Sequence, residues 1–195
     1  KIKKKFMEKK SKYCCPLSGK YFCIRQMLLF KEMNNILICD VNAKVTEKGV
    51  WCNPNRNDIE KAIKNKVFDR LLNKKLKIPS FFIESIESNL KLKILNLLGL
   101  SKKAGLLEIG YDKVLKAIKD ETVDAVLIDK EADKLKTLFI ENNDKNKISL
   151  YRCFSREEIG KAIGYKKVLC VALIASKLSN ALKLDFYRLK EFKCD

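Results

Sequence analysis

The chain has 195 residues, 47% of them hydrophobic, so it can build a globular core and is long enough for two small domains. Lysine and arginine outnumber acidic residues 42 to 24, and this net charge of +18 favours a polyanionic partner, most simply nucleic acid. No apolar run reaches the roughly 18 residues of a membrane span. The basic N-terminus also lacks the apolar segment of a secretory signal, so we expect a cytoplasmic protein with no membrane partner.

The positive charge is concentrated in the first half of the chain. Residues 1–78 hold 20 lysines and arginines against 7 acidic residues, whereas residues 79–195 hold 22 against 17. Lysine supplies 36 of the 42 cations, a bias that genome composition also produces, but such a bias does not explain the uneven distribution. We predict a basic domain at 1–78, with a lysine-rich disordered arm at 1–12, and a second domain at 79–195.

The first half reads as short strands followed by a helix, an α+β arrangement. Strands are predicted at 25–31 and 36–39, joined by the hairpin signal Asn34-Asn35, and at 48–52. Asn53-Pro54-Asn55 is typical of a helix start, because Asn is a good N-cap. The helix that follows is expected to turn these apolar side chains toward a core: Ile59, Ile63, Phe68 and Leu71.

The second half alternates helices and strands. Pro79 breaks any helix through residues 78–88, whose aromatic and aliphatic content is too high for a free linker. We expect Phe81, Phe82, Ile83 and Ile86 to start the first helix of the second domain or to dock the two halves. Helices ending before Gly105 and starting after Gly110 are followed by strand 123–128, helix 132–142, strand 148–152, helix 156–163, strand 168–173 and helix 177–189.

This alternation predicts an α/β protein whose second domain is an α/β/α three-layer sandwich with a mixed, largely internal sheet. Ser155 and Glu158 have the spacing of a capping box at the start of helix 156–163. Gly105 looks like a helix stop after Lys102 and Lys103, where the helix dipole favours cations. Gly110 opens a helix whose first N–H groups face outward, which suits a phosphate or a base edge.

Catalysis finds little support in the residues. The sequence has no phosphate-binding P-loop and no G-x-S-x-G motif. It also has no histidine, so its cysteines lack an imidazole partner that could activate a thiolate. No two cysteines have C-x-x-C spacing, and reduced thiols fit best. We therefore expect no enzyme, no cofactor and no metal. A metal site is conceivable but disfavoured among five of the eight cysteines, Cys14, Cys15, Cys23, Cys39 and Cys52.

Two runs in the second half carry a family resemblance. L-G-L-S-K-K-A-G-L-L-E-I-G-Y-D-K-V-L-K-A-I at 98–118, and E-I-G-K-A-I-G at 158–164 before an apolar strand, resemble the kink-turn-binding ribosomal-protein superfamily in its small bacterial YlxQ-like branch. The resemblance covers about residues 88–184 and implies the α/β/α fold and RNA binding. The candidate RNA-binding residues of this half are Lys102, Lys103, Gly110, Tyr111, Lys113, Lys116, Lys130, Arg156, Gly160 and Lys161.

The resemblance implies a role for several of these residues. Gly110 and the helical turn after it would contact the RNA kink, and Lys116 matches the family's lysine at the end of that motif. Asp112 and Lys113 occupy the positions that read tandem sheared G·A pairs, where strict kink-turn binders commonly have Asn and Glu or Gln. The loop before E-I-G-K-A-I-G would form a second contact wall, with Phe154, Ser155, Arg156 and Gly160, beside Lys130.

The first half has a resemblance of its own. Lys12-Tyr13-Cys14, Gly19, K-G-V-W-C-N-P-N-R at 48–56 and K-x-K-V-F-D-R at 64–70 resemble the YlxR family of small bacterial RNA-binding proteins, over about residues 10–76. Lys12 and Lys48 stand where that family usually has Arg, which keeps the charge but loses the forked donor geometry. The candidate RNA-binding residues are Lys12, Lys48, Gly49, Trp51, Arg56, Lys64, Lys66 and Arg70.

Trp51 has two interpretations: a core anchor, which we favour, or a platform for stacking a base. For the chain as a whole we expect a monomeric, non-enzymatic RNA-binding protein that recognises structured RNA, such as rRNA, ribonuclease P RNA or another kinked RNA, through two linked domains. The alternative is a protein adaptor associated with the ribosome or the transcription machinery. In that case the second domain binds protein and the first adds only charge.

Overall fold

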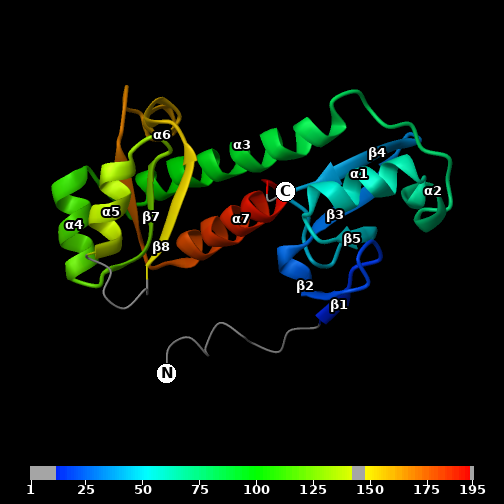
Figure 1. Cartoon of the computed structure of the whole chain (residues 1–195), viewed down its shortest axis with the longest axis horizontal. Helices are drawn as coiled ribbons and strands as arrows, with labels where there is room; N and C mark the ends of the chain where they lie inside the picture. The colour runs from blue at the N-terminus through cyan, green and yellow to red at the C-terminus, as the bar shows by residue number, and fades with distance from the viewer. Residues whose placement is uncertain (1–11, 142–147, 194–195) are drawn as a thin grey trace. The chain divides into compact units, whose positions relative to one another are not determined.

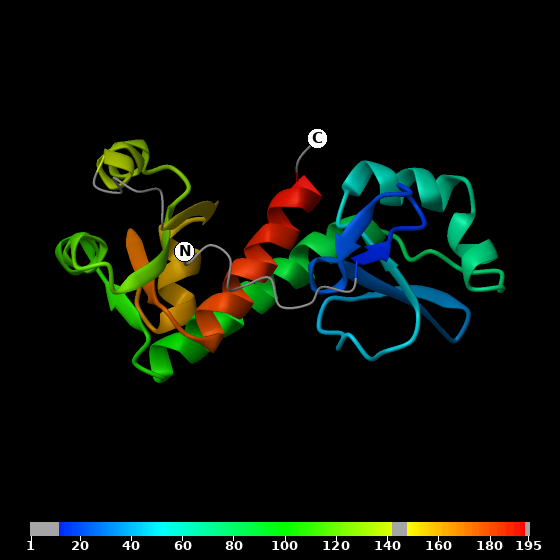
Figure 2. The same ribbon diagram turned by 90° about the horizontal axis from the view of Figure 1, so that it is seen from below.

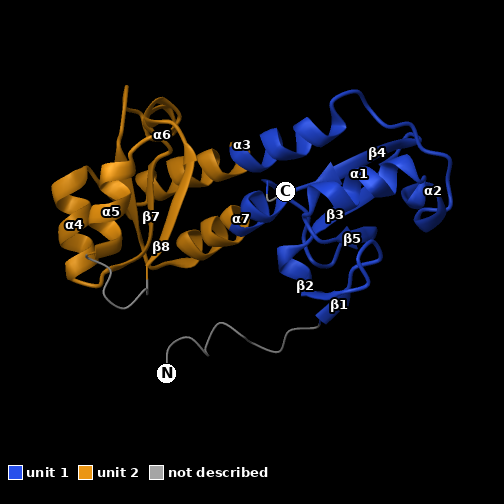
Figure 3. Cartoon of the chain, in the orientation of Figure 1, with its two compact units in different colours: residues 1–91, 187–195 blue, residues 92–186 orange. Residues whose placement is uncertain are grey.

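The computed structural model describes residues 12–141 and 148–193, so most of the predicted N-terminal arm and Cys194 lie outside the described residues. The chain divides into two compact units (Figure 3). Unit 1 is Lys1–Lys91 with Tyr187–Asp195, and unit 2 is Leu92–Phe186. The division adds the start of helix α3 (Phe82–Lys103) and the end of helix α7 (Lys177–Lys193) to the first unit. The domain limits 1–78 and 79–195 stay a prediction.

Unit 1 is built on a three-stranded antiparallel sheet of order β4-β3-β5 (Figure 1). The predicted hairpin is confirmed: Asn34 and Asn35 both have positive φ, which Asn tolerates, and Met33 pairs with Ile36 beside them. The strand expected at 25–31 starts later because Ile24–Gln26 form a 3-10 turn. The strands are β1 (Lys12–Cys14), β2 (Tyr21–Cys23), β3 (Leu28–Met33), β4 (Ile36–Asp40) and β5 (Val50–Cys52), with β1 and β2 forming a separate antiparallel pair.

Two helices follow in unit 1, α1 (Arg56–Lys64) and α2 (Val67–Leu71). The predicted N-cap is confirmed, because the Asn55 side chain accepts a hydrogen bond from the Asp58 N–H at 2.9 Å. Ile59 and Phe68 are buried as expected, but Leu71 is exposed. The expectation for Leu71 was wrong because Lys66, in a left-handed conformation, separates the two helices and interrupts their common periodicity.

The core of unit 1 lies between this sheet and helices. The Phe30 ring packs 4.9 Å from Phe68 and 6.4 Å from Phe82, measured between centroids. Phe82 and Ile86 start α3 and are buried, in agreement with the sequence, whereas Phe81 is exposed. Near the other end of the chain, the Arg188 guanidinium on α7 donates to the carbonyl oxygens of Val41 (3.3 Å) and Arg25 (2.5 Å).

Unit 2 contains a four-stranded mixed sheet of order β6-β9-β7-β8, which confirms the predicted α/β fold. β7 and β8 are parallel, and β9 is antiparallel to both β7 and β6. The sequence did not predict β6, because a strand of three residues is too short for its alternation to stand out. The elements are β6 (Leu107–Ile109), α4 (Tyr111–Lys119), β7 (Val123–Asp129), α5 (Asp133–Glu141), β8 (Ser149–Phe154), α6 (Arg156–Ile163) and β9 (Cys170–Ile174).

The sheet of unit 2 is covered on both faces (Figures 1 and 2). Helices α4 and α5 cover one face, where Val114, Val126, Phe139 and Cys170 belong to one buried cluster. Helix α6 and the parts of α3 and α7 that belong to unit 2 lie on the other face, which completes the three layers. The capping box of Ser155 and Glu158 at the start of α6 is confirmed. None of the helices in the described part of the chain is both long and apolar enough to cross a bilayer.

Candidate nucleic-acid interface

Four connections meet at one edge of the unit 2 sheet. Strands β6, β7 and β8 run in the same direction, because β6 and β7 are both antiparallel to β9 and β8 is parallel to β7. The carboxyl ends of these three strands and the start of β9 therefore share an edge, where ligands of α/β sheets commonly bind. We call this edge the carboxyl edge. It contains Gly110 after β6, Lys130 after β7, Ser155 and Arg156 after β8, and Val168 and Leu169 before β9.

Backbone hydrogen bonds hold the carboxyl edge together. They run from the N–H of Gly110 to the Cys170 oxygen (3.2 Å), from Asp129 to Leu169 (2.8 Å), from Lys130 to Phe154 (2.9 Å) and from Val168 to Arg156 (2.9 Å). Each bond joins two different connections or strand ends. The edge is therefore a fixed framework on which side chains hold defined positions.

The start of α4 leaves open space for a ligand. Gly110 has φ +95° and ψ 155°, a conformation that L side chains rarely adopt, and no atom lies within 4 Å of the position that a Cβ would occupy. No side chain caps this helix, so its first N–H groups are available to an anion. Asp112 and Lys113 are exposed on the first turn, and the Tyr111 ring stacks 6.0 Å from Phe139.

A buried carboxylate holds the arginine of the carboxyl edge. Arg156 Nε lies 2.8 Å from Asp129 Oδ2, and the Asp129 side chain is only 1% exposed, against 40% for Arg156. Asp129 Oδ1 also accepts a hydrogen bond from the Glu131 N–H at 3.3 Å. Of the three guanidinium nitrogens of Arg156, Nε is the one that pairs with an acidic side chain among the described residues. The pair therefore orients the arginine and leaves the rest of its donor fork for a ligand.

Charges at the carboxyl edge are nearly balanced. Lys167 pairs with Glu157 at 3.1 Å, and Arg152 pairs with Asp133 at 2.7 Å. Lys113, Lys130 and Lys166 are exposed and form no ion pair with another described residue. The sequence did not single out the connection at 164–169, although its Lys166-Lys167 pair lies shortly before the last strand. Only the central, antiparallel position of β9 brings this connection to the edge.

Other predicted residues of unit 2 lie away from this framework. Lys116 is exposed on a later turn of α4, and Lys103 and Lys161 are exposed on α3 and α6. Lys102 Nζ lies 3.3 Å from the Tyr165 hydroxyl and 5.2 Å from its ring centroid, a cation–π contact. The carboxyl edge thus brings together Gly110, Tyr111, Lys113, Lys130 and Arg156 from the predicted set.

The structure gives Gly160 a packing role, and its contact with RNA stays a prediction. Gly160 is buried in α6. A Cβ at this position would lie 2.8 Å from the Tyr165 carbonyl oxygen and 2.9 Å from the Lys167 nitrogen. Both are backbone atoms that cannot easily move, so the glycine lets the connection at 164–167 pass close to the helix.

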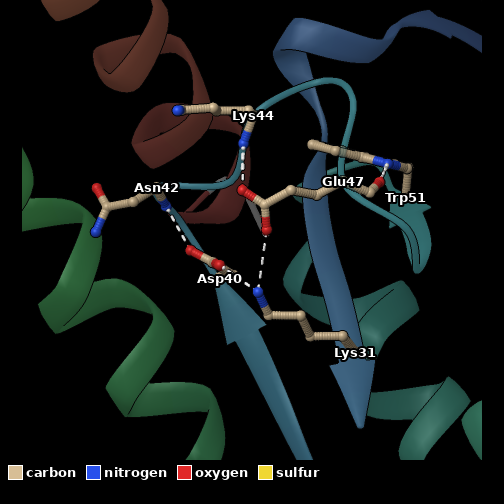
Figure 4. A network of polar contacts seen from close by, with 6 residues as sticks. All are labelled: Lys31, Asp40, Asn42, Lys44, Glu47 and Trp51. Atoms are coloured by element: carbon tan, nitrogen blue, oxygen red, sulfur yellow. Dashed lines mark hydrogen bonds and ion pairs between the residues drawn. The ribbon is translucent and has the colours of Figure 1, made fainter.

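In unit 1, Trp51 belongs to the core, and Gly49, although exposed, packs closely against β3. The Trp51 side chain is buried, and its Nε1–H donates a hydrogen bond to the backbone carbonyl oxygen of Glu47 at 3.4 Å (Figure 4). A Cβ on Gly49 would lie 2.7 Å from the Phe30 oxygen. The core interpretation of Trp51 is confirmed, and the stacking interpretation was wrong because a buried ring offers no face to a base. Gly49 likewise serves close approach to β3.

A polar network fixes the connection between β4 and β5 around Trp51 (Figure 4). Lys31 Nζ pairs with Asp40 at 2.7 Å and with Glu47 at 3.1 Å. The backbone N–H of Lys44 donates to Glu47 Oε1, the carboxylate oxygen that Lys31 does not contact, at 2.9 Å. The backbone N–H of Asn42 donates to the Asp40 carboxylate at 3.0 Å. These bonds lower the pKa of Glu47, chiefly through the Lys44 N–H, and raise the pKa of Lys31, chiefly through Asp40.

The predicted cations of unit 1 fall into two classes. Arg56 is already paired, with Glu60 at 2.8 Å and Glu84 at 3.5 Å, which makes it a weaker phosphate ligand than the sequence indicated. Lys12 and Lys48 are exposed on β1 and before β5. Lys64, Lys66 and Arg70 are exposed on or between α1 and α2, as is Lys61, which was not among the predicted residues. None of the four forms an ion pair with another described residue. We call these four residues the α1–α2 cation group.

The arrangement as a whole suits anion binding rather than metal binding. Among residues 12–141 and 148–193, no three His, Cys, Asp or Glu side chains are placed to hold a metal ion. The carboxyl edge instead offers backbone N–H groups, exposed lysines and an oriented arginine, all of which are hydrogen-bond donors that bind phosphate oxygens.

Comparison with known proteins bears on unit 2. Residues 93–183 match the model of the ribosomal protein L7Ae/L30e/S12e/Gadd45 family. This match confirms the superfamily resemblance seen in the second half of the sequence. The YlxQ-like assignment within that superfamily and the YlxR-like assignment of the first half stay predictions. No curated protein gives a significant match to the chain.

Solved structures similar to this chain also cover about half of it. A protein of unknown function from Bacillus halodurans is 25% identical, with a TM-score of 0.46, over 48% of this chain and 96% of that chain. A 15.5 kD RNA-binding protein from Giardia lamblia is 16% identical, with a TM-score of 0.45, over 53% of this chain and 90% of that chain.

Proposed function

We propose that this chain is a non-enzymatic RNA-binding protein of the cytoplasm in which unit 2 recognises a bent, structured RNA. The carboxyl edge supplies the recognition surface, and the α1–α2 cation group of unit 1 binds RNA backbone. The family match over residues 93–183 supports this choice of ligand. The observation that carries the proposal is the carboxyl edge itself, where an open glycine, an uncapped helix start and an oriented arginine share one hydrogen-bonded framework.

Each part of the carboxyl edge has a distinct task in this proposal. Phosphate oxygens bind the N–H groups at the start of α4, where the helix dipole favours negative charge. The absence of a side chain at Gly110 allows the RNA backbone to approach closely. Lys113 and Lys130 add charge, and Arg156 adds directional donors held by Asp129. Because the protein groups are fixed, an RNA already bent to match them binds more tightly than a straight duplex.

Unit 1 adds affinity without sequence preference. Exposed lysines bind phosphates as flexible point charges and release condensed counterions, which makes binding steeply dependent on salt. Two weak sites on one chain reinforce each other, since binding at one raises the effective concentration of the other. The targets that fit this scheme are rRNA, ribonuclease P RNA and other kinked non-coding RNAs.

The test compares a kink-turn RNA with the same RNA whose sheared G·A pairs are replaced by Watson–Crick pairs, at one near-physiological salt concentration. We expect the whole chain to prefer the kinked RNA by roughly tenfold or more, the discrimination that one or two mismatched base pairs produce. The double variant Lys113→Glu with Lys116→Glu should lose this preference. The matched control is Lys119→Glu, which reverses an exposed charge at the far end of the same helix.

Two results would contradict the proposal. One is equal binding of both RNAs by the unaltered chain. The other is an equal loss of binding in the double variant and in the Lys119→Glu control, because a defined site depends on where a charge lies and not only on its sign.

A second candidate is a protein adaptor associated with the ribosome or the transcription machinery. The near balance of charge at the carboxyl edge favours it, since Asp112, Glu131 and Glu157 stand among the lysines and Leu169 is 47% exposed. In this case RNA binding depends on unit 1 alone. The double variant in α4 then binds both RNAs as the unaltered chain does.

A further inference from the structure

Two cysteines of unit 1 lie where the β1–β2 hairpin joins the three-stranded sheet. Cys15 follows β1 and starts the turn to β2, since its N–H donates to the Lys20 oxygen at 2.8 Å and its oxygen accepts from the Gly19 N–H at 2.8 Å. Cys52 is the last residue of β5 and pairs with Leu28 of β3. Both side chains are 0% exposed. The hairpin and the sheet therefore meet through these two side chains.

The Cys15 sulfur lies against the end of β5, beside Cys52. Cys15 Sγ accepts a hydrogen bond from the Asn53 N–H at 3.3 Å, and Asn53 directly follows Cys52. The Cys52 thiol donates a second hydrogen bond to Cys15, and this bond is the main reason that the pKa of Cys15 is lowered and the pKa of Cys52 is raised. The donors at its sulfur favour the thiolate form of Cys15, and a thiol partner lies beside it.

Two other cysteines of the chain, the buried Cys170 and the partly buried Cys39, show the usual effect of burial. Burial raises the pKa of Cys170 in unit 2 to about 11, as expected for a thiol without a compensating donor. Burial is also the largest cause of the raised pKa of Cys39. Cys15 departs from this behaviour because several donors converge on its sulfur, those of Cys52 and Asn53 first among them. A cysteine that only fills core space has no need of such donors.

We propose that Cys15 and Cys52 form an intramolecular disulfide bond when a peroxide oxidises this chain, and that this bond fastens the β1–β2 hairpin to the three-stranded sheet. The inference is independent of the proposed RNA binding. It makes this sulfur pair a reversible modification site whose co-substrate is a small, uncharged peroxide. The turn above Cys15 contains exposed residues at Pro16, Gly19 and Lys20, so opening this one turn gives a water-sized oxidant access to the sulfur.

The reaction balances in two steps. The Cys15 thiolate attacks one oxygen of hydrogen peroxide, the O–O bond breaks, and a sulfenic acid forms while hydroxide leaves. The hydroxide takes up the proton that Cys15 released to solvent when it ionised, which gives the first water. The Cys52 sulfur then attacks the sulfenic sulfur, the S–S bond forms, and hydroxide leaves with the Cys52 proton as a second water. Two thiols lose two electrons and one peroxide is reduced to two waters. A thiol reductant reverses the modification.

The test oxidises the full chain with hydrogen peroxide, alkylates the remaining thiols under denaturing conditions and digests the protein with trypsin without reduction. Cleavage after Lys12, Lys20, Lys48 and Arg56 releases peptides 13–20 and 49–56, which carry Cys14 with Cys15 and Cys52 respectively. We expect these two peptides as a linked pair, lighter by two hydrogen atoms than their sum and separated by a thiol reductant. Fragmentation between Cys14 and Cys15 should place the link on Cys15.

Cys14 provides a matched control because it is adjacent in sequence but exposed. Cys14→Ser should leave the linked pair unchanged, and Cys15→Ser should abolish it. Oxidation should also raise the midpoint temperature of unfolding in Cys14→Ser but not in Cys15→Ser, since a cross-link between distant residues restricts the unfolded chain. The fragmentation experiment on the unaltered chain does not depend on how either variant folds.

Three results would overturn the proposal. The first is the absence of a linked 13–20 and 49–56 pair after oxidation. The second is a link that fragmentation assigns to Cys14. The third is a linked pair that persists in Cys15→Ser while it is lost in Cys14→Ser.

Discussion

The α1–α2 cation group and the carboxyl edge carry positive charge in different ways. The four cations of the α1–α2 group are exposed, without ion-pair partners among the described residues, on long side chains with many rotatable bonds. At the carboxyl edge, Arg156 is held by Asp129 and Lys167 by Glu157. The α1–α2 cation group therefore has a high density of charge whose positions are not fixed by partners. The carboxyl edge has donor groups in defined positions but little net charge.

This difference separates affinity from recognition. Mobile exposed cations attract phosphates wherever they lie, so the α1–α2 group should bind many RNAs with a strong dependence on salt. Oriented donors around an open glycine accept a phosphate only in a matching position, so the carboxyl edge should discriminate by shape. Four sets of measurements test how far the two regions, and the two units that carry them, differ.

The largest effect is expected from reversing charge in the α1–α2 cation group. The triple variant Lys64→Glu, Lys66→Glu and Arg70→Glu should weaken binding of kinked and control RNA equally, by on the order of 100-fold, since phosphate contacts dominate affinity. The salt slope should fall by about one for each phosphate that the protein no longer neutralises. Titrations at several salt concentrations measure both quantities. Arg56→Ala on the same helix is the control, with a smaller effect because Arg56 is already paired. Weaker binding of the kinked RNA alone would contradict this prediction.

The second effect concerns stability and compares the sulfur chemistry of the two units. The pKa of Cys15 is lowered to about 5 by its Cys52 and Asn53 donors, whereas an unfolded cysteine has a pKa of about 8.5. Between these values the folded chain binds fewer protons than the unfolded chain. The free energy of unfolding should therefore rise with pH from about 5 to 8.5, by up to about 1.4 kcal/mol per pH unit.

Above pH 8.5 the sign reverses in both units. Cys52 and Cys170 have raised pKa values, so they keep protons that the unfolded chain releases, and stability should fall. Chemical denaturation under reducing conditions across this range measures the curve. In Cys15→Ala the rise below pH 8.5 should flatten, while the fall due to Cys170 should remain. An unchanged rise in this variant would show that other groups cause it.

A smaller effect is expected at the arginine of the carboxyl edge. Arg156→Lys keeps the charge but loses the planar fork and its Nε contact with Asp129. The preference for the kinked RNA should fall roughly fivefold, which corresponds to the free energy of about one directional hydrogen bond. The affinity for the control RNA should change little. Competition binding with both RNAs gives this ratio. Lys161→Ala removes an exposed cation from the same helix and should leave the ratio unchanged.

The smallest effect should have the opposite sign. Asp112→Asn removes a carboxylate from the first turn of α4, where it opposes phosphate, and should raise RNA affinity about twofold to threefold. The same change should lower helix stability by about 0.3–1 kcal/mol, because acidic residues at helix starts favour the helix dipole. Binding and thermal unfolding of one variant test both. A weaker affinity for RNA would instead indicate that Asp112 contacts a base.

Local patterns predicted much of this structure. The Asn34-Asn35 hairpin, the Asn55 cap and the Ser155 capping box depend on neighbouring residues, and all three formed as expected. Where the local pattern was interrupted, the prediction was wrong: Lys66 takes a left-handed conformation between two helices, and Leu71 turns outward. Gly49, Trp51 and Gly160 stand in family-like motifs, but their close contacts show that they serve packing.

Most of the order of helices and strands, apart from β6 and the break between α1 and α2, can be derived from the amino-acid sequence, as can most helix boundaries and the concentration of charge in the first half. These properties follow from side-chain periodicity, capping and composition within short segments. Which connections meet depends instead on tertiary structure. The pairing of β9 between β6 and β7 brings the 164–169 connection to the carboxyl edge, and the packing of the β1–β2 hairpin sets Cys15 against Cys52. Strand pairing and burial join segments far apart in the chain, and no local pattern encodes the partner that each segment finds.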